Sequence, residues 1–66
     1  MKNRVRELRK SRRMTQEQFG DQLKVSRQTI NSIENGRYDP SLTLALKIAK
    51  LLGESVEEIF IPEEAD

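Results

Sequence analysis

The sequence predicts an all-α fold, with five short helices packed into one compact domain. Two capping boxes, Thr15 with Gln18 and Ser55 with Glu58, mark helix starts whose first backbone amides are satisfied by side chains. Apolar residues recur at intervals of three and four positions between such caps, which is the period of a helix with one buried face. A chain of 66 residues has room for a single small core, so all five helices should share it.

A basic stretch separates the first two helices. The first is expected over residues 4–12, with Asn3 as its N-cap. The second begins after Thr15, and its Gly20 would allow a neighbouring backbone to approach closely. The residues of these two helices that are expected to face the core are Val5, Leu8, Phe19 and Leu23.

The third helix is expected over residues 27–35, with Ser26 as its N-cap and the Asn35-Gly36 pair as its stop. It begins eleven residues after the start of the second helix, and the two meet at a tight bend. Ile30 and Ile33 share its inner face, together with Thr29. Two short helices joined in this way form a helix-turn-helix.

The last two helices follow an Asp39-Pro40 turn. Ser41 caps the fourth helix, which runs to about Leu52 and stops at Gly53. The fifth is short and ends near Phe60. The residues of the fourth helix expected to face the core are Leu42, Ala45, Leu46, Ile48, Ala49 and Leu52. The domain is therefore expected over residues 1–61, followed by a short acidic tail at 62–66.

The outer face of the third helix is polar and carries side chains suited to reading bases. Arginine pairs bidentately with guanine, and asparagine or glutamine with adenine, in the major groove of DNA. The amino-terminal turn of the helix would enter the groove most deeply. The predicted base-contacting residues are Arg27, Gln28, Asn31 and Ser32. A polar face that is merely solvated is the alternative.

The stretches TQEQFGDQL, SRQTINSIENGR and PSLTLALKIAKLLGESVEEIF resemble the phage repressor and Cro-type (XRE-like) helix-turn-helix family of DNA-binding transcription regulators. The resemblance covers nearly the whole chain. It implies a five-helix lambda-repressor-like DNA-binding domain, with the helix-turn-helix formed by helices 2 and 3. Lys24 departs from the family, which usually carries glycine at this bend, and a positive φ at Lys24 would cost about 1 kcal/mol.

Phosphate contacts are expected on either side of the third helix. Gln16 opens the preceding helix, where free amides and the helix dipole attract phosphate. By resemblance, the residues that follow the third helix hold the DNA backbone, namely Asn35, Arg37 and Tyr38. These contacts would position the protein without reading sequence.

The distribution of charge supports a nucleic-acid partner. Residues 1–37 hold ten basic and four acidic side chains, whereas residues 38–66 hold two basic and seven acidic ones. One face should therefore attract phosphate and the other repel it. The cations of the first helix and its surroundings are Lys2, Arg4, Arg6, Arg9, Lys10, Arg12 and Arg13. Each of them either contacts DNA or only keeps this face soluble.

Glu34 is an acid in the last turn of the third helix, where the helix dipole disfavours negative charge. It therefore needs a cationic partner unless it is solvated. The family resemblance implies that the partner is Arg9 on the first helix, in a structural ion pair.

Composition excludes most other classes of function. The chain has no cysteine and no histidine, and its three glycines form no phosphate-binding loop. We therefore expect no metal, no cofactor and no enzymatic activity. The amino terminus is charged from Lys2 and no apolar run is long enough for a signal peptide or a membrane span, so a cytoplasmic location without membrane contact is expected.

The end of the fifth helix carries more apolar surface than a short helix can bury. Ile59, Phe60 and Ile61 are the predicted dimer interface, and Val56 adds to the same apolar surface. A two-fold homodimer would place two recognition helices about 34 Å apart on palindromic half-sites. Alternatively, Phe60 and Ile61 close the domain's own core, or Ile61 extends a short strand that pairs with the amino terminus.

Two functions remain after these arguments. The first is a sequence-specific transcriptional regulator of double-stranded DNA, most simply a homodimeric repressor that occupies a palindromic operator. The second is an antitoxin-like module that binds a partner protein through its acidic carboxyl half, with or without binding DNA.

Overall fold

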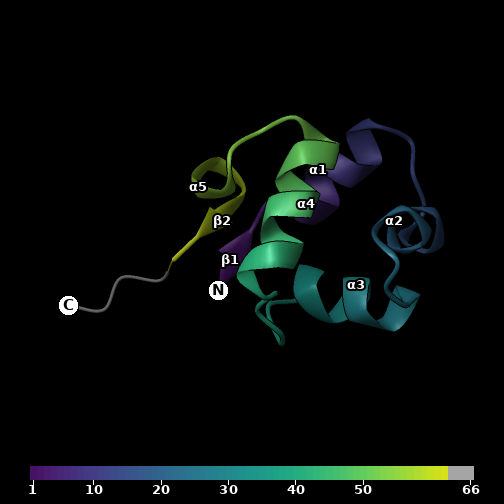
Figure 1. Ribbon diagram of the computed structural model, residues 1–66, viewed down its shortest axis with the longest axis horizontal. Coiled ribbons are helices and arrows are strands. Elements are labelled where there is room, and N and C mark those ends of the chain that lie inside the picture. The colour runs from purple at the N-terminus through teal and green to yellow at the C-terminus, as the bar shows by residue number, and fades with distance from the viewer. Residues whose placement is uncertain (63–66) are drawn as a thin grey trace.

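The computed structural model describes residues 1–62 and contains the five predicted helices. They are α1 (Val5–Ser11), α2 (Gln16–Leu23), α3 (Arg27–Glu34), α4 (Leu42–Leu52) and α5 (Val56–Ile59). Two short strands, β1 (Lys2–Asn3) and β2 (Phe60–Ile61), accompany them. Figure 1 shows α2 and α3 together at one end of the molecule, with α5 and the strands at the other. The acidic tail that the sequence predicts lies outside the described residues from position 63 onward.

Side-chain caps start the helices where the sequence predicts them. Thr15 and Ser55 complete capping boxes with Gln18 and Glu58, and both helix starts are therefore confirmed. Ser26 and Ser41 cap α3 and α4 in the same way, each accepting a hydrogen bond from the third amide of its helix. α1 differs from the expectation, because it begins at Val5 and Arg4 occupies its N-cap position without a side-chain cap bond.

The two ends of the described chain pair with each other. β1 lies antiparallel to β2, with Lys2 opposite Ile61 and Asn3 opposite Phe60. The fifth helix therefore ends at Ile59, and not at Phe60 as expected, because Phe60 adopts an extended backbone. The alternative in which Ile61 extends a strand beside the amino terminus is confirmed.

A single core lies between the five helices. Its buried apolar residues are Val5, Leu8, Phe19, Leu23, Ile30, Ile33, Ala45, Ile48, Ala49, Leu52, Ile59 and Phe60. Two predicted members are missing, because Leu42 is 70% exposed and Leu46 is 53% exposed. The apolar face of α4 is wider than the surface that its neighbours cover, so one edge of that face stays in water.

Candidate nucleic-acid interface

The bend between α2 and α3 is tight because of two local features. Lys24 adopts the left-handed conformation, with φ of 62° and ψ of 39°, which is the strained case that the sequence left open. Gly20 packs directly under the bend: a Cβ at this position would lie 2.6 Å from the carbonyl oxygen of Val25. The glycine therefore allows α2 and α3 to approach, which fixes the direction in which α3 leaves the domain.

α3 presents a polar face to solvent while two isoleucines anchor it. Ile30 and Ile33 are buried in the core, and the helix contacts α2 more extensively than any other element in residues 1–62. Its outward residues Arg27, Gln28 and Asn31 are exposed. Ser32, the fourth predicted base-contacting residue, is half-buried.

The predicted phosphate-contacting residues border this face. Arg37 and Tyr38 are exposed in the segment after α3, whose backbone amides donate to the carbonyl oxygen of Ser32 at 2.9 and 3.3 Å. Tyr38 lines a shallow hollow together with Gln28 and Ser32. The loop after α3 is thus folded back beside the residues expected to read bases.

Glu34 joins three elements behind this face, and its side chain is fully buried. Arg9 contacts it with two nitrogens, Nε at 2.7 Å from Oε2 and Nη2 at 3.1 Å from Oε1. Arg6 donates to Oε1 at 3.2 Å, and Gln16 donates to the same oxygen at 3.1 Å. The ion pair that the sequence suggests between Arg9 and Glu34 is therefore present, within a larger network.

The ionisation of Glu34 follows from this network. Burial by itself would raise the pKa of its carboxyl, but the hydrogen bonds from Arg9, Gln16 and Arg6 and the charge of Arg9 outweigh burial. The net result is a pKa below the usual range of a glutamate. Glu34 is therefore held as a carboxylate, and α1 is tied to α3 by charge-assisted hydrogen bonds.

Three predicted DNA-contacting side chains, Gln16, Asn31 and Asn35, are positioned by the same network. The Nε2 atom of Gln16 donates both to Glu34 and to Oδ1 of Asn31, the latter at 3.2 Å. Asn35 accepts a hydrogen bond from Nη2 of Arg6 at 2.7 Å. This role of Arg6 was not predicted from the sequence, although its spacing of three residues from Arg9 on one helix face could have indicated it.

Two cations at the ends of α1 also serve the fold. Arg4 contacts Glu54 at 2.9 Å and Glu7 at 3.3 Å. Arg12 donates from Nη2 to the carbonyl oxygen of Leu52 at 2.7 Å, and so caps the end of α4. Part of the basic cluster therefore holds helices together, although the sequence left its role open.

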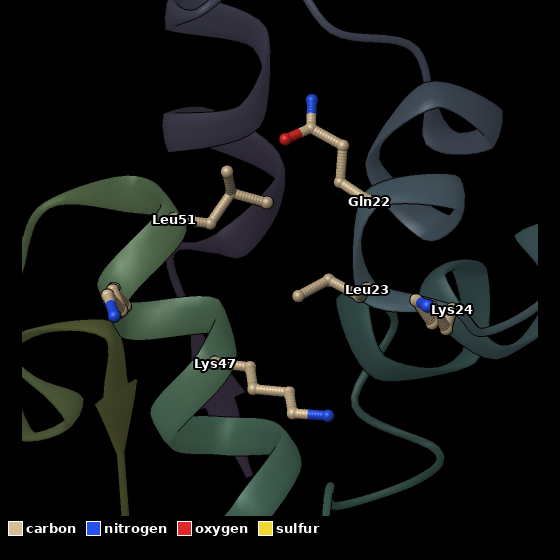
Figure 2. Close-up of a pocket in the computed structure, with 6 residues that line it drawn as sticks. Gln22, Leu23, Lys24, Lys47 and Leu51 are labelled. Carbon is tan, nitrogen blue, oxygen red and sulfur yellow. The ribbon is translucent and has the colours of Figure 1, made fainter.

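Positive charge also gathers beside the bend. A hollow between α2 and α4 is lined by Gln22, Leu23, Lys24, Lys47, Lys50 and Leu51 (Figure 2). Figure 2 shows Lys47 extending from α4 across the gap toward the end of α2, where Lys24 lies. The two cations of the otherwise acidic carboxyl half therefore add to the basic surface around the helix-turn-helix.

The apolar residues at the carboxyl end of the described chain are mostly buried. Ile59 and Phe60, two of the three residues predicted for a dimer interface, are buried in the domain's own core. Only Ile61 is well exposed, at 45%. Within residues 1–62, no helix has the length and apolar character needed to cross a membrane.

Comparison with known proteins adds independent information on this arrangement. The sequence model of the family described as Helix-turn-helix matches residues 5–59. The chain is 53% identical over 64 residues to an HTH-type transcriptional regulator of Methanocaldococcus jannaschii, covering 97% of each chain. It is 48% identical over 64 residues to an HTH-type transcriptional regulator of Bacillus subtilis, again covering 97% of each. It is also 38% identical over 66 residues to the immunity repressor protein of Bacillus phage phi105, matching 92% of this chain and 46% of that protein.

Proposed function

This chain belongs to the XRE-type helix-turn-helix family of DNA-binding transcriptional regulators, and we propose that it acts as a repressor that occupies a palindromic operator as a homodimer. The observation that carries the proposal is the exposed polar face of α3, anchored by Ile30 and Ile33 and backed by the Glu34 network. Occupying an operator requires no catalytic step. The name of the phage relative, an immunity repressor, is consistent with repression by occupancy.

The proposed reading of bases depends on fixed side-chain orientation. Arg27 and Gln28 lie in the first turn of α3, exposed and free to enter the major groove. Asn31 accepts a hydrogen bond from Gln16 at its Oδ1, so its Nδ2 group is the donor that remains for a base. We therefore propose that Asn31 contacts a base-edge acceptor, such as N7 of a purine.

The proposed phosphate contacts are made by a backbone amide before α3 and by side chains after it. The two N–H groups of the Gln16 side chain are already directed at Glu34 and Asn31. The backbone amide of Gln16, at the unsatisfied start of α2, is the better phosphate donor. Arg37, Tyr38 and Asn35 would grip the DNA backbone with their side chains on the other side of α3.

Selection of bound duplexes from a random pool tests the function directly. A sequence-specific dimer should enrich a palindrome whose half-site centres are about one helical turn apart. An enriched site without two-fold symmetry would reject the homodimer and keep the DNA-binding function. A pool that shows no enrichment would reject sequence-specific recognition.

Replacing Gln28 by alanine should weaken binding to the selected site about tenfold or more and leave binding to random DNA nearly unchanged. Gln28 carries no charge, so its loss does not alter counterion release. Both affinities are measured by titration at one salt concentration. Gln22→Ala, an exposed glutamine on α2 away from α3, is the matched control and should change neither affinity. Equal losses on both duplexes for Gln28→Ala would show that this residue does not read bases.

Replacing Arg37 by alanine should weaken binding by a similar factor on every sequence. The slope of log affinity against log salt should fall by about 0.9, the contribution of one phosphate contact. The measurement is a series of titrations on selected and random duplexes at several salt concentrations. Lys47→Ala removes one charge from the basic surface without a proposed phosphate contact, and should lower the slope by clearly less than 0.9. A loss confined to one base position would contradict the assigned role of Arg37.

A further inference from the structure

The hollow between α2 and α4, which we call the α2–α4 hollow, is separate from the surface proposed to contact DNA. Gln28, Ser32 and Tyr38 line a different hollow beside α3. The α2–α4 hollow has a volume of about 420 Å³, within the range of sites that bind organic groups. Its lining contains none of the residues assigned to bases or phosphates, and consists of Gln22, Leu23, Lys24, Lys47, Lys50 and Leu51.

Three lysines surround the α2–α4 hollow, and none of the residues from 1 to 62 that line it is acidic. Lys24, Lys47 and Lys50 are all exposed, and none of them forms an ion pair within residues 1–62. Lys47 and Lys50 are also the only basic residues of positions 38–66, which hold seven acidic ones. Because like charges gathered in one place repel each other, an anionic group is favoured in the hollow.

The base of the α2–α4 hollow is apolar. Leu23 is buried and Leu51 is half-buried, and Figure 2 shows both side chains extending into the space between α2 and α4. The aliphatic stems of the lysines extend this apolar surface, while their ammonium groups stay in water at its edge. A phosphate gains nothing from an apolar base. A peptide with a large apolar side chain between two acids matches both the base and the edge.

The backbone of Lys24 supports the same assignment. Its positive φ of 62° costs a lysine about 1 kcal/mol, whereas a glycine adopts such a φ without that cost. Strained residues concentrate where a side chain is needed for function. No ion pair within residues 1–62 offsets the cost at Lys24, and an anionic partner would offset it.

We propose that the α2–α4 hollow binds an acidic peptide segment of a partner protein. A large apolar side chain of the segment packs on Leu23 and Leu51. Aspartate or glutamate side chains on either side of it pair with Lys24, Lys47 and Lys50. This interaction goes beyond DNA binding and does not rest on the proposed repressor. Because the hollow shares no residue with the proposed DNA contacts, the domain can hold DNA and the segment together.

Selection of random peptides displayed on phage against the full chain tests this chemistry without assuming a sequence. The enriched peptides should carry a large apolar residue flanked by aspartate or glutamate. An enriched peptide is then synthesised with a fluorescent label and titrated with the protein by fluorescence anisotropy. No enrichment, or enrichment of basic or uncharged peptides, would overturn the proposal.

Variants of the protein locate the peptide on the surface. Lys47→Glu should weaken peptide binding about tenfold or more, and Leu51→Ala should weaken it about fivefold. Lys10→Glu makes the same charge change at an exposed position of α1 outside the hollow, and should weaken binding by less than about twofold. Circular dichroism checks that all three variants fold. Equal losses for Lys47→Glu and Lys10→Glu would show that binding follows net charge, and would overturn the proposal.

A competition experiment separates an acidic peptide from DNA as the occupant of the hollow. Adding a random-sequence duplex should leave the peptide bound, because the proposed DNA contacts lie elsewhere. Displacement of the peptide by the duplex, or a fall of about 0.9 in the salt slope of DNA binding for Lys47→Ala, would identify the hollow as a phosphate site and overturn the proposal. Failure of the duplex selection would reject the DNA-binding function without changing the peptide titrations.

Discussion

Replacing Arg9 by alanine is expected to lower the free energy of unfolding by about 3 kcal/mol, because it leaves a buried carboxylate with too few donors. The Glu34 side chain is fully buried, and Arg9 supplies two of its hydrogen bonds. Arg9 also donates to the carbonyl oxygen of Met14 at 2.7 Å, so that oxygen loses its partner too. A 66-residue domain has only several kcal/mol of total stability, and the variant should be substantially unfolded at moderate temperature.

Urea unfolding of Arg9→Ala, Glu34→Ala and the double variant measures the interaction itself. The double variant should lose much less than the sum of the two single losses, with a coupling energy above about 1 kcal/mol. Additive losses would mean that Arg9 and Glu34 act independently, in spite of their contact. The free energies are compared at one pH near neutrality, where both groups are charged.

The acid dependence of stability provides a check on the same network. Because the folded-state pKa of Glu34 is lowered, its contribution is complete above the unfolded pKa of about 4.3. That contribution is lost as the pH falls through the lower folded-state pKa. Glu34→Gln should therefore lose stability at neutral pH and show a weaker further decline in acid than the unmodified protein.

Replacing Gly20 by alanine is expected to destabilise the domain by about 2 kcal/mol, through overpacking against the bend. The added Cβ would lie 2.6 Å from the Val25 carbonyl oxygen and 3.4 Å from Cγ1 of Ile30. The direction of the change in stability is informative, because alanine in place of glycine inside a helix normally stabilises by up to about 1 kcal/mol. Here the close approach of α3 should outweigh that gain.

The stability of Gly20→Ala is measured by urea unfolding, beside Gln22→Ala as a control on the exposed side of α2. The control should change stability by no more than about 0.5 kcal/mol. A Gly20→Ala protein as stable as the unmodified one would mean that α3 can move away without cost.

Features that depend on nearby sequence were predicted well. Capping boxes at Thr15 and Ser55 form within four residues, so their patterns specify them without tertiary information. The positive φ of Lys24, in contrast, was not predicted, because the sequence showed only that a bend falls at a position where the family usually carries glycine. The polar face of α3 could be predicted because Ile30 and Ile33 determine which side is buried.

Features that depend on the packing of other helices and strands could not be predicted in the same way. Periodicity gives the centre of the buried face of α4 but not its width, and Leu42 and Leu46 were therefore assigned to the core wrongly. Asn3 was expected to cap α1 only. Its Oδ1 accepts from the Val5 amide at 3.1 Å, while its Nδ2 donates to the carbonyl oxygen of Ile33, thirty residues away. The link from Gln16 to Asn31 likewise exists only once α2 and α3 have docked.

The pairing of β1 with β2 joins the two ends of the described chain, and this affects which part of the domain opens first. Joining positions about sixty residues apart costs about 3–4 kcal/mol of chain entropy, more than two very short strands can repay. The pairing of the two strands therefore depends on the helices that pack beside it. Amide hydrogens of β1 and β2 should exchange with solvent faster than those of α2 and α3. Because Asn3 holds the end of α3, a brief parting of the two ends would loosen α3 while most of the core stays intact.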